Sequence, residues 1–524
     1  MREESFLRGV LVLTLAGLAS RAVGAVYRVF LYPVLGPEGI GLFQMAYPVY
    51  STLLVLSTSG ANVAISRMVS DRLGRGLAYE VPGVFRLICL LLGGAGAVLS
   101  VALFWGAPWV AEVVYREPRA TLPLAAVAPA IFAVGLLSAY RGLFQGYEKM
   151  YPPALSQMAE QLVRVGTMFA LAWLLLPYGI PWAAAGAAFG AVTGGAAGVL
   201  YLLASRGSLP RVKSRYRLDR GGVLREFLRQ AIPVSLTGGI FTLAGLVDVV
   251  VPGRLQVSGL SPEMATAWYG RLTGGAMPLV NLSSLFTASL QLALVPAVAR
   301  SLAAGEAESV QRYAATGVRL TVSITAAASL GLMLLAEPLS LSLYGDPLVA
   351  VTLRPLAFCA LCLGLQQTTA GVLQGLGLVT LPVWHLAAGA AVKTAVTWYL
   401  SADPAWGVVG AAWGSVAGFG TAGLLGLLSL VRQLGPVVTW DEVLLRPLGA
   451  LLVMGLCLPA LYHWGATGLG HPWAGILAAV GGGAALYFLA LLVLGGFKEE
   501  DLEMLPTKAE PLRRWLLRSG LVRR

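Results

Sequence analysis

The chain has 524 residues, of which 57% are apolar and only 12% are charged, and its mean hydropathy is +0.76. Because a soluble globular chain carries about 25% charged residues, this composition excludes a soluble domain and predicts an all-α polytopic membrane protein. The net charge of +12 is typical of basic cytoplasmic loops, and no compact basic domain is large enough to dock a duplex, so we expect no nucleic-acid partner.

Apolar stretches of about 20 residues predict the membrane spans. Runs of this length are unlike the alternating strands, about ten residues long, of a transmembrane β-barrel. We expect about fourteen transmembrane helices, at 9–33, 40–66, 83–107, 121–145, 153–177, 181–204, 230–253, 272–298, 314–336, 349–374, 381–401, 406–431, 443–463 and 473–496.

The first predicted span contains two arginines, Arg21 and Arg28, which are seven residues apart and therefore project from one helical face. A charge at mid-bilayer depth costs roughly 2.5–3.5 kcal/mol. We expect the stripe to line a wet cationic interior that suits an anionic cargo. The alternative is that each side chain reaches an interface, which is easier for Arg28 because it lies closer to the outer end. Four further residues share the stripe, namely Thr14, Gly17, Gly24 and Tyr32, whereas Leu15, Leu18, Val26, Val29 and Phe30 fall elsewhere.

The fifth span contains an acid and a base four residues apart, Glu160 and Arg164. Mutual neutralisation inside the helix bundle is the simplest account, and contact with substrate is the alternative. Lys393 in span eleven has Gly389 four residues before it in place of an acid. Arg164 and Lys393 are therefore both candidate substrate-binding residues.

Spans seven and eight provide three more candidates for the central cavity. Asp248 is one of very few carboxylates at membrane depth, and it would pair with an arginine of span one, bind a coupling cation, or be buried beside a polar neighbour. Arg271 enters span eight from outside. Asn281 shares a face of that span with Ser284 and Gln291, where amides either join helices or contact cargo.

Charge distribution predicts the orientation. Most of the 37 Lys and Arg residues fall in loops that share one side when the N-terminus is cytoplasmic, so we expect both termini on the cytoplasmic side of the membrane. The Arg-rich segment 205–229 is a predicted surface linker, and the basic tail 497–524 is a predicted interfacial amphipathic helix. The resulting division is an N-lobe at 1–204, a C-lobe at 230–432 and helices thirteen and fourteen within 433–496.

An internal repeat supports two six-helix lobes. Segment 274–296 aligns with the segment that begins at Phe43, which places Ala276-x-Pro278 on Ala46-x-Pro48. The motif Gly142-x-x-Gln145-Gly146 recurs at residues 371–375, and a basic residue, Arg164 or Lys393, follows each glutamine by nineteen positions. The offset of about 230 residues contains six spans, so the halves have the same orientation and should be related by an axis along the membrane normal.

Several segments resemble the polysaccharide exporter branch of the multidrug/oligosaccharidyl-lipid/polysaccharide (MOP) superfamily, and within it the stage V sporulation protein B and MurJ-like lipid II flippase group. They are SRAVGAVYRVFLYPVLGPEGIGLFQMAYPVYSTLLVLSTSG, YRGLFQGYEKMYPPALSQMAEQLVR, YGRLTGGAMPLVNLSSLFTASLQLALVPAVA and GVLQGLGLVTLPV. The resemblance implies a cationic cavity whose arginines grip the diphosphate of an undecaprenyl-linked sugar carrier. Arg21 matches the group's serine–arginine motif, whereas Arg28 falls one position beyond the second cationic site, where this chain has Tyr27. The resemblance also implies that helices thirteen and fourteen form a groove for the lipid tail.

The predicted function is therefore a flippase for a lipid-linked cell-wall precursor or oligosaccharide, working as a monomer among membrane lipids, with no cofactor, no metal and no catalytic residue. One alternative is a cation-coupled multidrug exporter of the same superfamily, which needs cavity carboxylates. A second is a glycosyl-lipid transferase, for which the candidate acids are Glu112, Glu117, Glu263 and Asp346.

Overall fold

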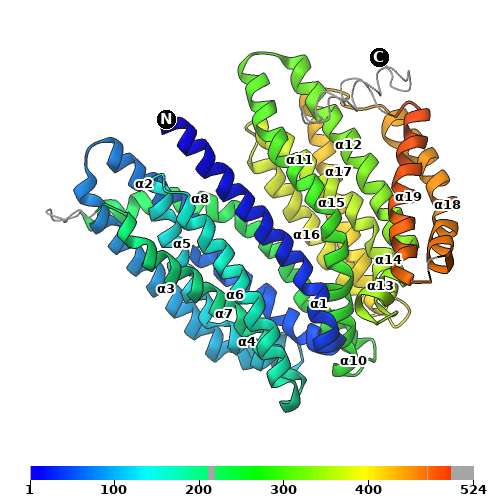
Figure 1. The fold of residues 1–524 in the computed structure, drawn as a ribbon, viewed down its shortest axis with the longest axis horizontal. Helices are drawn as coiled ribbons and strands as arrows, with labels where there is room; N and C mark the ends of the chain where they lie inside the picture. Colours follow the sequence, from blue (N-terminus) through cyan, green and yellow to red (C-terminus); the bar gives the residue numbers. More distant parts are fainter. Residues whose placement is uncertain (1, 59, 211–218, 469, 497–524) are drawn as a thin grey trace. The chain divides into compact units, whose positions relative to one another are not determined.

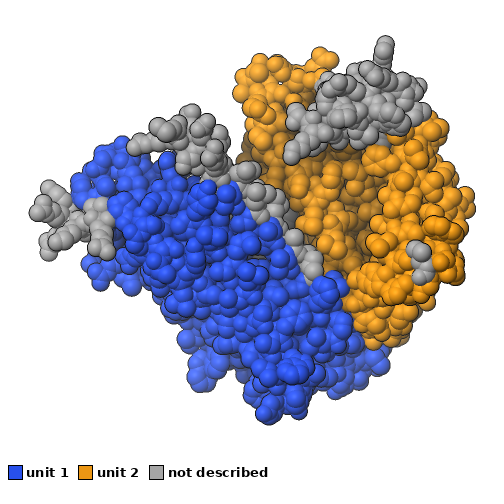
Figure 2. Space-filling view, viewed as in Figure 1, with its two compact units in different colours: residues 1–270 blue, residues 271–524 orange. Residues whose placement is uncertain are grey.

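The computed structural model describes residues 2–58, 60–210, 219–468 and 470–496, although the side chains of 2–11, 14, 15, 18, 21, 22, 25, 26, 28 and 233–244 lie outside the described part. The described residues are almost entirely helical and contain no strand (Figure 1). The chain divides into two compact units, unit 1 at Met1–Gly270 and unit 2 at Arg271–Arg524, which Figure 2 colours blue and orange. The predicted tail 497–524 and part of the predicted linker lie outside the described residues.

Unit 1 is a bundle of long helices joined by short turns (Figure 1). Its helices are α1 (Arg2–Thr58), α2 (Ala61–Gly74), α3 (Val81–Trp109), α4 (Thr121–Val127), α5 (Pro129–Gly146), α6 (Tyr151–Leu175), α7 (Ile180–Ala204), α8 (Arg220–Leu246), α9 (Val251–Val257) and α10 (Pro262–Gly270). Because α8 packs against α1, α2 and α3, it belongs to this unit. The unit boundary thus falls after the linker at 205–229, and the division into lobes at that linker stays a prediction.

Helix α1 contains the first predicted span and the start of the second. It is broken at Gly36, whose φ of 67° and ψ of 175° are not helical. Pro33 and Pro37 flank the break, and proline removes a backbone donor and disfavours the helical conformation of the residue before it. The gap predicted between residues 33 and 40 is therefore a sharp bend.

Unit 2 begins with the short π-helix η7 (Arg271–Ala276). It continues with α11 (Met277–Ala303), α12 (Ala307–Leu334), α13 (Ala336–Tyr344), α14 (Val349–Leu356), α15 (Phe358–Gly375), α16 (Thr380–Leu400), α17 (Gly407–Leu434), the π-helix η8 (Asp441–Leu445), α18 (Arg446–Gly468) and α19 (Pro472–Val493). The pair α18 and α19 lies side by side in Figure 1, and α18 also contacts α12.

The helices confirm an all-α polytopic membrane fold. Ten described helices are long and apolar enough to cross a membrane, and the bent pair α14–α15 would make eleven. The other three predicted spans correspond to the first half of α1, to α8 and to α16, which are helical but are not among those ten.

The predicted internal repeat is visible as recurring helix packing. A Cβ built on Gly146 of α5 would lie 2.6 Å from Val69 Cβ of α2, and one built on Gly375 of α15 would lie 2.7 Å from Val298 Cβ of α11. Gly375 follows Gly146 by the same number of residues as Val298 follows Val69. Glycine at each contact lets the two helices approach closely.

The same correspondence relates α6–α7 to α16–α17. Helix α7 carries the sequence GAAFGAVTG at 186–194, and α17 carries GAAWGSVAG at 410–418. A Cβ on Gly194 would lie 2.7 Å from Arg164 Cβ, and a Cβ on Gly418 would lie 2.7 Å from Lys393 Cβ. The two predicted basic residues therefore occupy equivalent places in their units, each covered by a glycine of the next helix.

Two buried tyrosines extend the repeat to the other end of the helices. Tyr115 donates a hydrogen bond to the Met45 carbonyl at 2.5 Å, and Tyr344 donates one to the Gly275 carbonyl at 2.8 Å. Tyr344 and Gly275 are the repeat equivalents of Tyr115 and Met45. The two halves thus share helix order, glycine contacts and a buried hydrogen bond.

Candidate functional site

A buried charged cluster joins α5 to α6 in unit 1. Arg141 Nη2 lies 2.8 Å from Glu160 Oε2, and Arg164 Nη2 lies 2.6 Å from Glu160 Oε1. Arg141 also donates from Nε to Ser156 Oγ at 3.0 Å, and Ser156 in turn donates to the Pro153 carbonyl at 2.7 Å. The predicted pair of Glu160 and Arg164 is confirmed, but a second guanidinium makes it a triad.

The triad carries one net positive charge in a poorly solvated place. The exposed fractions of the Arg141, Glu160 and Arg164 side chains are 14%, 15% and 20%. Each oxygen of the one carboxylate is occupied by a different arginine. Buried charges are stable only when they are paired and hydrogen-bonded, and one carboxylate compensates only one of the two cations.

Arg164 lines a small pocket that Arg141 does not reach. The other polar lining residues are Tyr27, Tyr47 and Tyr50, from α1. The rings of Tyr47 and Tyr50 pack edge to face, with centroids 6.2 Å apart. Arg164 Nε is buried and has no hydrogen-bond partner among the described residues. The pocket has a volume of about 20 Å³, so it brings a guanidinium and phenol side chains to a space with room for a group of about the size of a water molecule.

The predicted stripe of α1 faces α6 at its two glycines. A Cβ on Gly17 would lie 3.8 Å from Gln157 Oε1, and one on Gly24 would lie 3.5 Å from Gln161 Nε2. Phe30, expected off the stripe, is 63% exposed. Arg21 and Arg28 belong to α1, but their side chains lie outside the described part, so their place in a cavity stays a prediction.

Two candidates of unit 2 lie in helices that pack at the repeat contacts. Lys393 in α16 is 4% exposed, and Gly418 of α17 covers its Cβ. Asn281 in α11 is half-buried, and its carbonyl accepts a hydrogen bond from Ser284 Oγ at 2.8 Å. The structure brings neither residue into the pocket beside Arg164.

Arg271 and Asp248 have protein surroundings of their own. Arg271 Nε lies 2.8 Å from Asp346 Oδ2, and its carbonyl faces the Thr352 hydroxyl. Asp248 is half-buried in the short 3₁₀ turn Val247–Val250 and interacts electrostatically with Tyr115. Their roles in substrate binding remain predictions.

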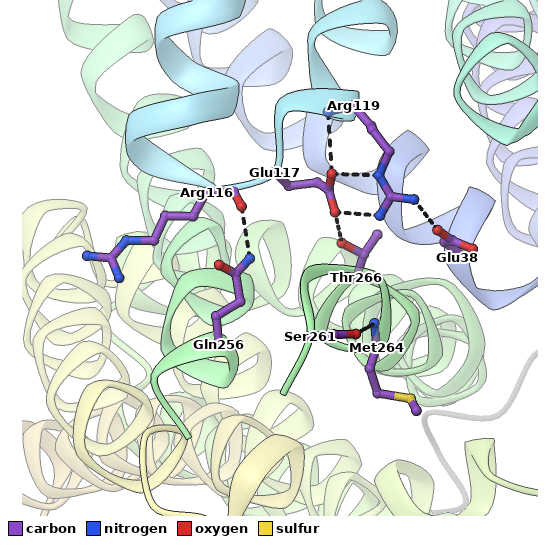
Figure 3. Close-up of polar contacts among 8 residues, drawn as sticks. All are labelled: Glu38, Arg116, Glu117, Arg119, Gln256, Ser261, Met264 and Thr266. Atoms are coloured by element: carbon purple, nitrogen blue, oxygen red, sulfur yellow. Dashed lines mark hydrogen bonds and ion pairs between the residues drawn. The ribbon is translucent and has the colours of Figure 1, made fainter. Parts of the chain in front are cut away.

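A buried polar cluster joins α1, the turn Pro118–Ala120 and α10 (Figure 3). The Glu117 side chain is 1% exposed and accepts hydrogen bonds from Arg119 Nε at 2.8 Å, Arg119 Nη2 at 2.7 Å and Thr266 Oγ1 at 2.9 Å. Arg119 also pairs with Glu38. Glu117 and its repeat equivalent Asp346 thus each hold an arginine, which fits a structural role better than the acid–base role of the transferase alternative.

Unit 2 contains an apolar groove of about 490 Å³. Helices α11, α12, α13, α18 and α19 contribute to its walls, and its lining includes Ile324, Leu335, Met454, Leu458, Tyr487 and Phe488. The extra helix pair therefore forms part of a lipid-compatible surface depression.

Sequence reasoning missed Arg141. Arg141 lies near the end of the span predicted at 121–145 and was not among the candidate site residues, yet its side chain is buried in the bundle. The available signal was Glu160 of α6. Arg164 neutralises its charge but occupies only one of its two carboxylate oxygens, which leaves the other for a second donor. Within the described residues, no group of three or more His, Cys, Asp and Glu side chains is placed to hold a metal ion.

Comparison with known proteins finds related sequences over most of the chain. Residues 6–302 match the family model described as polysaccharide biosynthesis protein, and residues 233–400 match the model described as MatE. Stage V sporulation protein B of Bacillus subtilis (strain 168) is 31% identical over 514 residues, which cover 97% of this chain and 98% of the relative. Lipid II flippase MurJ of the same organism is 25% identical over 414 residues, covering 74% and 76%.

Two solved structures show the same fold. One is described as lipid II flippase MurJ in an inward closed conformation, with a TM-score of 0.68 and 15% identity over 92% of this chain and 98% of that one. The other is an inward-facing multidrug resistance MATE family transporter of the MOP superfamily, with a TM-score of 0.63 and 16% identity over 82% and 98%. The chain belongs to the polysaccharide biosynthesis protein family and has the multi-pass helical membrane fold of these two solved structures.

Proposed function

We propose that this protein is a flippase that moves an undecaprenyl-diphosphate-linked cell-wall precursor or oligosaccharide across the cytoplasmic membrane by alternating access. The observation that carries the proposal is the buried triad with its excess positive charge, which reaches a tyrosine-lined pocket through Arg164. We also propose that the protein works as a monomer with both termini in the cytoplasm.

The chemistry of a diphosphate headgroup fits these residues. Guanidinium groups donate to phosphate oxygens in a planar fork, and such charge-assisted bonds are stronger than neutral ones. Tyrosine contributes a ring that packs against a sugar face and a hydroxyl that bonds to oxygen. Arg21 and Arg28 of the same helix as Tyr27 would add further positive charge, and Lys393, Arg271 and Asn281 would serve the second half of the path.

The apolar groove supports a lipid-linked cargo over a free anion. Its lining is almost wholly aliphatic and aromatic, which suits a prenyl chain and not a sugar. A cargo of this kind keeps its tail in hydrocarbon while only the head needs a polar path. Two relatives carry consistent names, stage V sporulation protein B and lipid II flippase MurJ.

The multidrug alternative, a cation-coupled exporter, is less well supported by the geometry of unit 1. Such a pump needs a carboxylate that a cationic drug can reach, but Glu160 is held on both oxygens by arginines. The resulting positive charge repels cations.

Transport in proteoliposomes tests the proposal. The purified protein should flip a fluorescent undecaprenyl-diphosphate disaccharide, and Arg164→Ala should lower the initial rate by about tenfold or more, because a charge-assisted bond to phosphate is lost. Arg75→Ala is the matched control, since this arginine is exposed and pairs only with Asp71 of its own helix turn. Extrusion of cationic dyes, with no flipping of the diphosphate lipid, would contradict the proposal.

A further inference from the structure

Three equivalent positions in the two halves of the chain hold residues of different charge. In unit 1 the equivalent positions hold Arg141, Glu160 and Arg164, and in unit 2 they hold Ala370, Gly389 and Lys393. Formal charges of plus, minus and plus leave one positive charge in the first set. The second set contains one base and no acid.

Steric packing explains why unit 2 has no acid at this level. A Cβ on Gly389 would collide with the Gly418 carbonyl oxygen of α17 and would lie 3.1 Å from Ala422 Cβ. An acidic side chain therefore has no room there. Ala370, at the place of Arg141, is buried at 2% exposure and has no acid at Gly389 to balance.

In unit 1 the acid has room, but its negative charge cancels the positive charge of the arginine that lines the pocket. Glu160 Oε1 holds Arg164 at 2.6 Å, so a pair of Glu160 and Arg164 alone would be neutral. Arg141 approaches the opposite oxygen, Oε2, at 2.8 Å and donates a hydrogen bond to Ser156, and neither Arg141 nor Ser156 lines the pocket. Its charge thus offsets the carboxylate without entering the pocket.

We propose that Arg141 is a positioning residue whose charge offsets Glu160, so that Arg164 presents a net positive charge to an anionic headgroup. This inference rests on the proposed function, because it names how that binding site is charged. Removal of Arg141 should weaken anion binding and transport, and simultaneous removal of the acid should restore both.

A set of four variants tests the balance: Arg141→Ala, Arg141→Lys, Arg164→Ala and the double variant Arg141→Ala/Glu160→Gln. Flipping of the diphosphate lipid in proteoliposomes should fall about tenfold in Arg141→Ala and recover to within about threefold of the parent in the double variant and in Arg141→Lys. The flipping rate of Arg164→Ala should fall about as far as that of Arg141→Ala, and no second substitution in this set is expected to restore it. A purely structural ion-pair network would instead be damaged further by the second substitution.

A binding readout separates this inference from the proposed function. Inorganic pyrophosphate should raise the thermal unfolding midpoint of the parent and of the double variant, and it should raise those of Arg141→Ala and Arg164→Ala much less. If pyrophosphate shifts the midpoints of the parent and the variants as expected but the parent does not flip the lipid, the proposed cargo is refuted. The inference that Arg141 offsets the charge of Glu160 would still hold.

Three results would overturn the inference. In the first, a folded double variant is as inactive as Arg141→Ala. In the second, Arg141→Ala flips lipid and binds pyrophosphate like the parent. In the third, pyrophosphate does not shift the midpoint of the parent at all, which would refute the anion site itself. If Arg141→Ala does not accumulate, the double variant and Arg141→Lys still decide the outcome, because both are required to retain activity.

Discussion

The helix pairs α6–α7 and α16–α17 have the same backbone packing and different chemistry. In both pairs a ladder of glycines four residues apart lies against the preceding helix, and one glycine covers a basic residue. In the first pair the base has an acid on its own helix and a second base from α5, whereas in the second pair glycine stands at the place of the acid and alanine, from α15, at that of the second base. Backbone contact has therefore been kept while the charged partners have changed.

This difference indicates that helix packing is more constrained between the two halves than the charges around the base. Close glycine packing fixes where the base leaves its helix, so the positions of Arg164 and Lys393 correspond. The residues at the places of Arg141 and Glu160, in contrast, differ in charge between the two halves. The following predictions test either the shared packing or the differing charge.

Substitution of the acid should have the largest effect on stability. Glu160→Ala leaves two buried guanidiniums without a carboxylate, and breaking such a pair costs about 3–5 kcal/mol. We expect a strongly lowered thermal unfolding midpoint in detergent. Glu308→Gln, at an exposed site in the first turn of α12, is the control and should change little. A loss no greater than that of the control would mean that the triad is solvated.

The glycine ladders should respond alike in the two units. Gly194→Ala and Gly418→Ala each place a methyl 2.7 Å from a side-chain Cβ, and overpacking of this kind costs about 1–3 kcal/mol. Gly166→Ala in α6 and Gly481→Ala in α19 meet no atom within 4 Å, so they should be neutral or slightly stabilising because alanine favours the helix. Unfolding midpoints of the four variants check this, and a tolerant Gly418 would break the equivalence.

The paired tyrosines allow a finer test of the repeat. Tyr115→Phe and Tyr344→Phe each remove one buried hydrogen bond to a carbonyl, which should cost about 0.5–1.5 kcal/mol in either unit. The two losses should add in the double variant, because the sites share no partner. Unequal losses, measured by the same unfolding assay, would show that the ends of the two halves are held differently.

Local features of this chain were predictable from sequence. Long apolar runs in lipid must satisfy their backbone groups internally, which is why the helices were foreseen. The pair of Glu160 and Arg164 was foreseen because both residues lie on one helix, four positions apart. The repeat was foreseen from two short motifs, and the structure extends it to Tyr115 and Tyr344.

Contacts between helices were not predictable in the same way. Arg141 meets Glu160 across two helices, and no spacing rule connects them. The groove is made by five helices whose apolar faces look alike in sequence, whether they meet lipid or protein. Arg119 lies between the spans predicted at 83–107 and 121–145, yet it binds the buried Glu117 beside α10 (Figure 3). Each case depends on tertiary packing, which single-sequence patterns do not encode.

The smallest expected effect comes from exchanging the two kinds of base. Arg164 holds Glu160 with one nitrogen while it lines the pocket, and a guanidinium offers several donors in one plane. Arg164→Lys keeps the charge but has a single ammonium for both tasks, so flipping should fall about threefold to fivefold. Lys393→Arg adds donors where neither Ala370 nor Gly389 brings an acid, so its rate should stay within about twofold of the parent. Initial flipping rates in proteoliposomes, normalised to folded protein, decide the matter: equal losses in both variants would mean that each half requires the shape of its own base as well as the positive charge.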